Sequence, residues 1–112
     1  MSGNQFKELS VKRCKNGFLA KEPTAFSDEY VFNHFDGVQH HLYNFFGVEV
    51  KKFLSLDSGY VFWQSFSIIH NPMSTMNKYR VIQYFDGSTV VNSRECSSVE
   101  ECIKIIVKGI QI

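Results

Sequence analysis

Cysteine and histidine are the side chains of this sequence best suited to act as nucleophiles or metal ligands. There are three cysteines, and an odd number cannot pair completely within one chain, so we expect reduced thiols. Cys96 and Cys102 are separated by five residues, which is not the two-residue gap of a zinc knuckle or a redox motif. We expect Cys102 to be a small buried residue on a helix.

The four histidines are His34, His40, His41 and His70, and their spacing does not define a metal site. On a helix His40 and His41 would point about 100° apart, and His34 would lie on the preceding strand. A nucleophile built from Cys14 and a histidine such as His40 is an alternative, but no spacing fixes its geometry. The glycines are scattered singly and form no phosphate-binding loop. We therefore expect no metal, no cofactor and no enzymatic activity.

Aromatic side chains are unusually dense, with eleven Phe, five Tyr and one Trp. Within residues 60–66, period-two alternation puts Tyr60, Phe62 and Phe66 on one side of a strand and Trp63 on the other. If helices cover only one face of the sheet, some rings are exposed or covered by a partner. Exposed rings stack unpaired bases or anchor protein interfaces.

The first half of the chain predicts a hairpin, a strand and a helix. Phe6 to Lys21 is expected to be a hairpin that turns at Asn16-Gly17, and residues 29–35 are expected to form a third strand. A helix should follow, with Asp36 as its N-cap, Gln39 in capping-box spacing and Gly47 as its end. Alternatively, Asp36-Gly37 is itself a hairpin turn.

The second half predicts three strands and a helix. The strands are expected at Tyr60–Ile69, Tyr79–Phe85 and Ser88–Arg94, with Asp86-Gly87 as a two-residue turn between the last two. The helix should begin at Ser97, with Glu100 in capping-box position. Its buried face is expected to be Val99, Cys102, Ile103, Ile106 and Val107. Residues 48–56 fit either a short strand or a helical turn.

Together these elements predict an α+β fold in one domain of 112 residues. An antiparallel sheet of about five to six strands, with two helices packed on one face, buries the single apolar stripe of each helix. Both halves end in a helix, which suggests a duplicated arrangement, although no residues align between them.

The charge balance argues against two kinds of protein that bind DNA or imitate it. The net charge is +1, which fits neither a basic protein that coats duplex DNA nor an acidic mimic of DNA. The charge is polarised, with +3 over residues 1–22 and −3 over residues 23–60, and such a surface suits a protein partner that has patches of both signs. The sequence has no signal peptide and no membrane span, so we expect a cytoplasmic protein that does not bind membranes.

These observations favour a non-enzymatic protein that binds another macromolecule. Trp, Tyr and Arg carry most of the binding energy at protein interfaces. We therefore predict Trp63 and Tyr84 as aromatic anchors and Arg80 and Arg94 as their polar partners. Trp63 is equally suited to be the largest side chain of the core.

The compact α+β pattern resembles the small inhibitors that bacteriophages and mobile elements make against host defence, including anti-CRISPR proteins. The features that carry the resemblance are the Asn16-Gly17-Phe18 hairpin, the Tyr30-Val31-Phe32 strand that leads to a helix, and the helix from Ser97 to Lys108. The resemblance implies that the target is a nucleic-acid-handling effector protein, such as a CRISPR effector, and that inhibition is steric. The near-neutral charge favours an allosteric or interface blocker.

Two further possibilities concern partners. The chain is alternatively a single-stranded nucleic-acid-binding protein, in which rings stack bases and cations contact the backbone. The residues for this role are Lys12, Arg13, Tyr60, Phe62 and Phe66, together with Tyr79, Arg80 and Tyr84. A bare sheet edge after the last hairpin could also pair with a second copy, which would make a homodimer.

Overall fold

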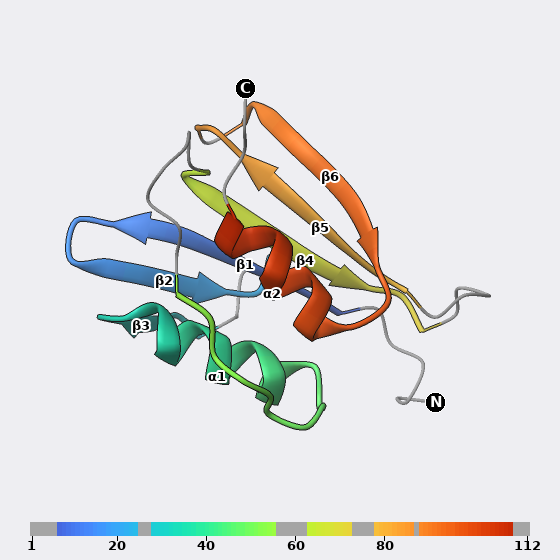
Figure 1. Cartoon of the computed structure of the whole chain (residues 1–112). Coiled ribbons are helices and arrows are strands. Elements are labelled where there is room, and N and C mark those ends of the chain that lie inside the picture. Colours follow the sequence, from blue (N-terminus) through green and yellow to red (C-terminus); the bar gives the residue numbers. More distant parts are fainter. Residues whose placement is uncertain (1–6, 25–27, 56–62, 73–77, 87, 109–112) are drawn as a thin grey trace.

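Six antiparallel strands form one sheet in the order β3-β2-β1-β4-β5-β6, and two helices contact it (Figure 1). The computed structural model describes residues 7–24, 28–55, 63–72, 78–86 and 88–108. The strands are β1 (Lys7–Cys14), β2 (Gly17–Lys21), β3 (Tyr30–Phe32), β4 (Ser65–His70), β5 (Tyr79–Tyr84) and β6 (Val90–Cys96), and the helices are α1 (Phe35–Phe45) and α2 (Val99–Lys108). The predicted α+β class and the antiparallel sheet with two helices are confirmed.

The two halves of the chain have the same topology. Each half is a three-stranded meander followed by a helix, and the halves join through antiparallel pairing of β1 with β4. α1 contacts β2 and β3, and α2 makes the corresponding contacts with β5 and β6. The buried positions of the helices follow one spacing, Phe35, Val38, Gln39, Leu42 and Tyr43 in α1 and Val99, Cys102, Ile103, Ile106 and Val107 in α2. The duplicated arrangement therefore exists at the level of topology and burial, without residue identity.

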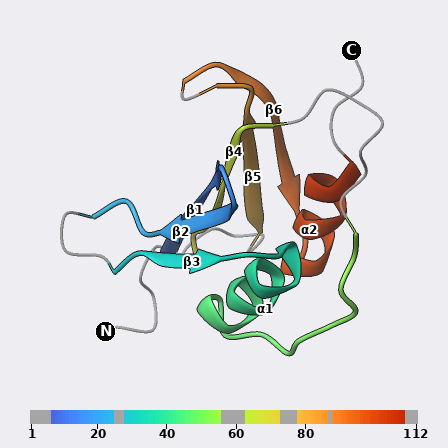
Figure 2. The same ribbon diagram turned by 90° about the vertical axis from the view of Figure 1, so that its left-hand side faces the viewer.

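Both helices lie on the same face of a strongly twisted sheet. Figure 2 shows β2 and β3 running across the view while β4, β5 and β6 run up it, with both helices on one side. The core fills the space between this face and the helices. Its centre is formed by residues that are at most 1% exposed, among them Leu9, Val11, Leu42, Phe66, Ile68, Val81, Ile103 and Ile106.

The first hairpin is confirmed, but its turn lies one residue earlier than predicted. Cys14 pairs with Gly17, so Lys15 and Asn16 are the loop residues and Gly17 already belongs to β2. Gly17 is needed for a different reason: a Cβ atom there would lie 2.1 Å from the carbonyl oxygen of Phe32. The glycine lets the backbone of the next segment approach closely.

Helix α1 begins one residue before the predicted N-cap. Its N-cap is His34, which makes no side-chain capping hydrogen bond, and Asp36 lies in the first turn. The alternative of a hairpin turn at Asp36-Gly37 is wrong, because both residues are helical. Gly47 follows the helix with φ of 72°, which confirms the predicted glycine stop. The third strand is shorter than predicted, at three residues.

The predicted capping role of Gln39 is also wrong, because its side chain is buried. Gln39 Nε2 donates to the carbonyl of Leu54 and Gln39 Oε1 accepts from the Leu54 backbone N–H, both at 2.8 Å. Residues 48–55 form neither the strand nor the helical turn that the sequence allowed. The amide of Gln39 therefore satisfies a backbone segment that has no regular secondary structure of its own.

Of the long strand predicted at Tyr60–Ile69, residues 65–69 belong to β4, and Trp63 and Gln64 lie before it. Tyr60 and Phe62 lie outside the described residues. Trp63 precedes β4 and is 1% exposed, and its Nε1 donates to the carbonyl of Ile106 at 2.8 Å. Trp63 is therefore a core residue. Its enclosed ring presents no surface to a partner.

The connection from β5 to β6 is longer than the predicted two-residue turn. Phe85 N–H donates to the carbonyl of Thr89, which closes a wider loop. Asp86 Oδ1 accepts from the backbone N–H groups of Ser88 and Thr89, and the first of these bonds is the main reason why the pKa of Asp86 is lowered. Gly87 lies outside the described residues.

Helix α2 has the predicted buried face, but its cap is one residue later. The backbone N–H of Glu101 donates to Ser98 Oγ at 3.1 Å, so Ser98 rather than Ser97 is the capping residue. Glu101, rather than Glu100, reaches back, and its Oε1 accepts from the N–H and from the hydroxyl of Ser97, each at 2.7 Å.

Candidate functional site

The face of the sheet opposite the helices is a candidate binding surface of the described chain. Side chains alternate along a strand, so the register assigns each residue to a face. Residues beside the buried Val11, Phe66 and Val81 point away from the helices. They form three rows across the strands, namely Val31-Leu19-Lys12-Ser65-Tyr84-Val90, Lys21-Ser10-Ser67-Ile82-Ser93 and Glu8-Ile69-Arg80-Glu95. We call this surface the open face.

The centre of the open face is made of small hydroxyl side chains. Ser10 and Ser67 face each other across β1 and β4 and share a hydrogen bond of 2.9 Å. Ser65 is the next neighbour of Ser67 on this face. Short side chains leave low relief here, and the bond between the two hydroxyls uses one donor and one acceptor, so the centre is flat and retains some hydrogen-bonding capacity.

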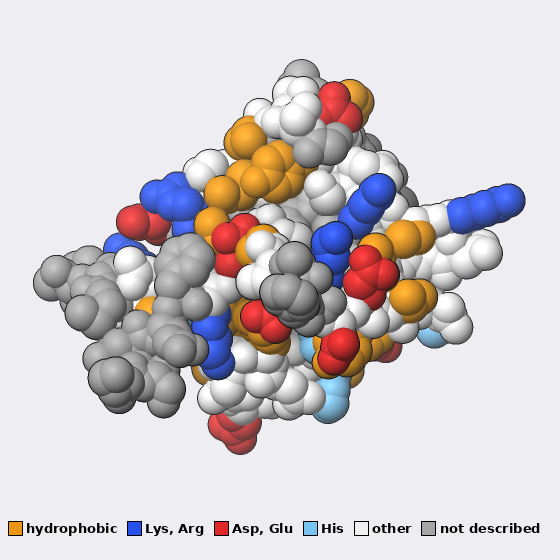
Figure 3. Space-filling model, turned by 180° about the vertical axis from the view of Figure 1, so that it is seen from behind, with side chains coloured by type: hydrophobic (Ala, Val, Ile, Leu, Met, Phe, Trp, Pro, Cys, Tyr) orange, Lys and Arg blue, Asp and Glu red, His pale blue; other side chains and the backbone are white. Residues whose placement is uncertain are grey.

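Apolar side chains adjoin the serines on the β5 and β6 side. Ile69, Ile82 and Tyr84 are partly exposed, and Val90 is 52% exposed. Figure 3 shows hydrophobic side chains gathered in a band on this side of the molecule, beside white polar atoms and between charged groups. Apolar area that a monomer leaves open in this way is typical of an interaction surface.

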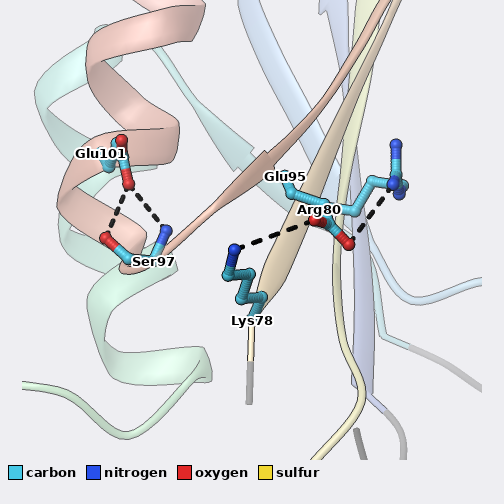
Figure 4. A network of polar contacts seen from close by, with 5 residues as sticks. All are labelled: Lys78, Arg80, Glu95, Ser97 and Glu101. Atoms are coloured by element: carbon cyan, nitrogen blue, oxygen red, sulfur yellow. Dashed lines mark hydrogen bonds and ion pairs between the residues drawn. The ribbon is translucent and has the colours of Figure 1, made fainter. Parts of the chain in front are cut away.

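A network of charged residues borders the face where β5 begins and β6 ends (Figure 4). Glu95 lies 3.6 Å from Arg80 Nη2 and 4.0 Å from Lys78 Nζ, and Arg80 Nη1 donates to Ser93 Oγ at 2.8 Å. Beside it is a hollow of about 190 Å³, lined by Ile69, Asn71, Lys78, Tyr79, Arg80 and Glu95. The carboxylate between the two cations fixes the guanidinium on the open face.

Among the predicted partner-binding residues, the open face holds Arg80 and Tyr84. Arg94 is exposed but pairs with Val81, so its side chain points to the helix side. Trp63 is in the core, as described above. The structure therefore brings together one anchor and one cation of the predicted set, and leaves two of the predicted residues elsewhere.

The residues predicted for nucleic-acid binding are also divided. Lys12 is exposed on the open face. Arg13 lies on the other face, with its guanidinium 4.4 Å from the Trp63 ring centroid, and burial lowers its pKa. Phe66 is 0% exposed and Tyr79 is 8% exposed, with its ring stacked on His70 at 4.2 Å. Neither ring is available to stack a base.

Sequence reasoning missed the serines and the branched aliphatic residues of the open face. Ser10, Ser67, Ile69 and Ile82 were not singled out, because none of them has chemistry that stands out alone. The signal was present in β4, where Ser65, Ser67 and Ile69 alternate with the buried Phe66 and Ile68. Only the order of the strands shows that these residues adjoin Arg80 and Tyr84 in space.

The side chains that were considered for catalysis or metal binding do not converge within the described residues. Cys14 Sγ donates to the carbonyl of Lys12 at 3.8 Å, whereas His40 Nδ1 is 3.1 Å from Asn44 Nδ2 on α1. His41 lies against the rings of Tyr30 and Phe32, and burial lowers its pKa. No three His, Cys, Asp or Glu side chains in this part of the chain are close enough to hold a metal ion.

Neither α1 nor α2, the helices of the described chain, has the length and apolar character that a bilayer span requires.

Comparison with known proteins adds no functional class. No protein family model matches the chain, and no curated protein and no solved structure is significantly similar to it. The open face is therefore interpreted from its own chemistry.

Proposed function

We propose that this chain is a non-enzymatic binding protein whose open face docks on the surface of another protein. The observation that carries the proposal is that, within the described residues, one face of the six-stranded sheet has no helix over it and combines a flat serine centre, an apolar band and fixed charges. Protein interfaces likewise combine apolar contact area with polar and charged groups.

The charges favour a protein partner over a nucleic acid. Arg80 and Lys78 share Glu95, and Lys21 lies 3.8 Å from Glu29 at the other end of the sheet. A phosphate backbone on this face would meet these carboxylates as well as the cations, which weakens its attraction. A protein with patches of both signs gains from both.

The resemblance to anti-CRISPR-like inhibitors makes the proposal more specific. It implies that the partner is a nucleic-acid-handling defence effector in the cytoplasm and that the chain blocks it by occupying a surface. The near-neutral net charge of +1 supports a blocker of an interface or an allosteric inhibitor rather than a DNA mimic.

The proposal is tested by site-specific photo-cross-linking followed by affinity measurement. A benzophenone amino acid replaces Ile82 on the open face or, as the matched control, Lys104 on the exposed side of α2. We expect a cross-link to one defined protein from position 82 only. The purified partner should then bind the wild-type chain, and Tyr84→Ala and Arg80→Ala should each weaken binding by about tenfold or more, which is about 1.4 kcal/mol.

The Lys104→Ala variant should bind the purified partner as the wild type does. The proposal fails if position 104 cross-links to the partner and position 82 does not, or if Tyr84→Ala and Arg80→Ala bind with unchanged affinity. It also fails if the open face cross-links only to a second copy of this chain.

A further inference from the structure

Helix α1 carries a histidine that is packed among aromatic rings. The ring centroid of His41 lies 4.7 Å from that of Tyr30 and 5.4 Å from that of Phe32, and both of these residues belong to β3. A third ring, that of Phe45 one turn further along α1, lies at 6.3 Å. His41 is therefore part of the contact between α1 and the edge strand β3.

The imidazole is enclosed so that one of its nitrogens has no polar neighbour. The Nε2 atom of His41 is buried and has no hydrogen-bond partner among the described residues. A neutral imidazole can leave this nitrogen without a proton, whereas an imidazolium carries an N–H donor on both nitrogens. A charged donor that is buried without an acceptor costs more free energy than an unpaired neutral nitrogen. The geometry of the contact thus favours the neutral form of His41.

Two titratable side chains near His41 have opposite effects on its charge. The carboxylate of Glu22, which follows β2, favours the charged imidazole, and the adjacent His40 disfavours it. Burial is the largest influence, and the pKa of His41 is lowered. The direction agrees with the unpartnered Nε2 atom.

The other polar groups that face this cluster come from β1 and β3. Tyr30 contributes a phenol, which is neutral at ordinary pH. Lys7 of β1 places its ammonium 5.7 Å from the ring centroid of Phe45 and donates to the carbonyl of the same residue at 3.2 Å. A cation therefore already lies over the Phe45 ring, and a proton on His41 would add a second positive charge beside it.

Strand β3 is held by few interactions besides this contact. It has three residues, lies at the edge of the sheet and pairs with β2 alone among the described strands. Tyr30, although it packs on His41, is 46% exposed. Short elements at an edge open locally at a lower free energy than central strands. A change in the packing of His41 is therefore felt first at β3.

We propose that His41 makes the docking of β3 on α1 sensitive to pH, so that the neutral imidazole holds the strand and protonation in mildly acidic solution loosens it. In the open state the imidazole binds a proton with its ordinary affinity, and in the docked state it binds the proton less readily. Docking is therefore strongest above the ordinary pKa of histidine and weakens as the pH falls from that value towards the lowered one.

The inference concerns the chain alone and does not depend on the proposed function. Loosening of β3 would expose the rings of Tyr30 and Phe32 to solvent. It would also move Val31, which lies between them in the strand and points to the open face. The protein would thus lose one corner of the open face in acid while the central strands stay paired.

The test is amide hydrogen exchange measured by NMR on the full chain, from about pH 7.5 to about pH 5.5. Rates are expressed as protection factors, which remove the intrinsic effect of pH on exchange. We expect the protection of residues 30–32 to fall by about threefold or more on acidification, and that of Ile68 and Val81 in the centre of the sheet to change less. The ring signal of His41 should titrate below about pH 6.5, the ordinary midpoint of histidine.

Two variants separate the titration of His41 from a general effect of acid. His41→Phe keeps an aromatic ring against β3 and cannot be protonated, so the protection of residues 30–32 should no longer depend on pH. His40→Gln, the matched control at the exposed neighbouring position, should retain the dependence of the wild type.

Three results would overturn the proposal. The first is a wild-type protection of residues 30–32 that does not change with pH, and the second is a change that persists in His41→Phe. The third is a His41 midpoint at or above about pH 6.5, as expected if attraction of the imidazolium to the aromatic rings outweighs burial. The wild-type exchange and titration decide even if His41→Phe does not fold.

Discussion

At the scale of single residues, Gly17 has the least room for a side chain among the described glycines. A Cβ atom there would lie 2.1 Å from the Phe32 carbonyl oxygen, so β2 and the end of β3 must separate to accept it. We expect Gly17→Ala to lower the free energy of unfolding by about 3 kcal/mol, as overpacking does. Gly47→Ala is the control: no atom lies within 4 Å of its Cβ, and only its φ of 72° is strained, at about 1 kcal/mol. Equal losses in urea unfolding would contradict this account.

Gln39 is the second residue whose replacement should be costly. Its amide satisfies both backbone groups of Leu54, and a leucine of similar size would leave both without their partner. We expect Gln39→Leu to cost about 1–3 kcal/mol for each group left unpaired inside the protein, measured by urea unfolding. His40→Ala on the exposed side of the same helix should change stability by less than about 0.5 kcal/mol. A stable Gln39→Leu variant would show that the segment after α1 does not need this clamp.

Residue type alone identified some of the residues on the open face. It also selected residues that lie elsewhere, and the physical reason differs from one residue to the next. Tyr84 and Arg80 were found because their types are common at interfaces, and their strand happens to turn them outward. Trp63 has the same preference, but its indole N–H found a carbonyl on α2, a contact between positions 43 apart that no local pattern encodes. Sequence alone cannot decide which face of a strand the helices will cover.

At the scale of elements, the start of α2 depends on which of two adjacent serines is the cap. The N–H of Glu101 donates to Ser98 Oγ, so Ser98→Ala should lower the free energy of unfolding by about 0.5–2 kcal/mol. Ser97→Ala retains the backbone N–H that bonds to Glu101 and should cost less. Thermal unfolding of both variants decides the assignment. A larger loss from Ser97→Ala would move the cap back to the position that the sequence pattern suggested.

The carboxylate of Glu101 makes the stability of the protein depend on pH in a defined direction. Its hydrogen bonds from the N–H and hydroxyl of Ser97 lower its pKa, so the folded protein binds this proton less readily than the unfolded chain. The resulting stabilisation is present above the ordinary pKa of a glutamate and is lost as the pH falls through the lowered value. The stability difference between the wild type and Glu101→Gln should therefore shrink on acidification.

Glu100→Gln is the matched control for this titration, because it removes the same charge from the same turn without the bonds to Ser97. Stability is measured by chemical unfolding over the same acidic pH range. The stability difference between the wild type and Glu100→Gln should depend less on pH than the difference between the wild type and Glu101→Gln. If both variants give the same pH profile, the general charge at the helix start matters and the specific bonds do not.

Elements were easier to predict than their ends. The apolar stripe of α2 alternates so regularly with polar residues that its buried face was correct at every position. Caps and turns failed by one residue, at Asn16-Gly17 and at Ser97, because adjacent residues had similar local preferences. The role of Gly17 is set by its close approach to Phe32, and the role of Gln39 is set by its hydrogen bonds to Leu54. A local sequence pattern does not encode such tertiary contacts.

At the scale of the whole molecule, the mass in solution and the response to oligonucleotides distinguish the remaining partners. The edge strand β6 pairs only with β5 among the described strands, so a second copy has an edge to use. If the open face serves a protein partner, light scattering after size exclusion should give a monomer of 13.0 kDa. Short single-stranded DNA and RNA should leave the elution unchanged at low and at high salt. A complex that dissociates with salt would instead favour the nucleic-acid alternative.

The joining of the two halves through β1 and β4 has a consequence for how the chain is made. During synthesis the first three strands and α1 leave the ribosome before β4, the second partner strand of β1, has emerged. Ser10 and Ser67, the bonded pair at this junction, are 57 positions apart, whereas the β1–β2 hairpin closes locally. For that interval β1 is an edge strand with unpaired backbone groups and alternating apolar residues, which is the kind of edge that pairs with other chains. The interval before β4 emerges is therefore one in which this protein is exposed to aggregation.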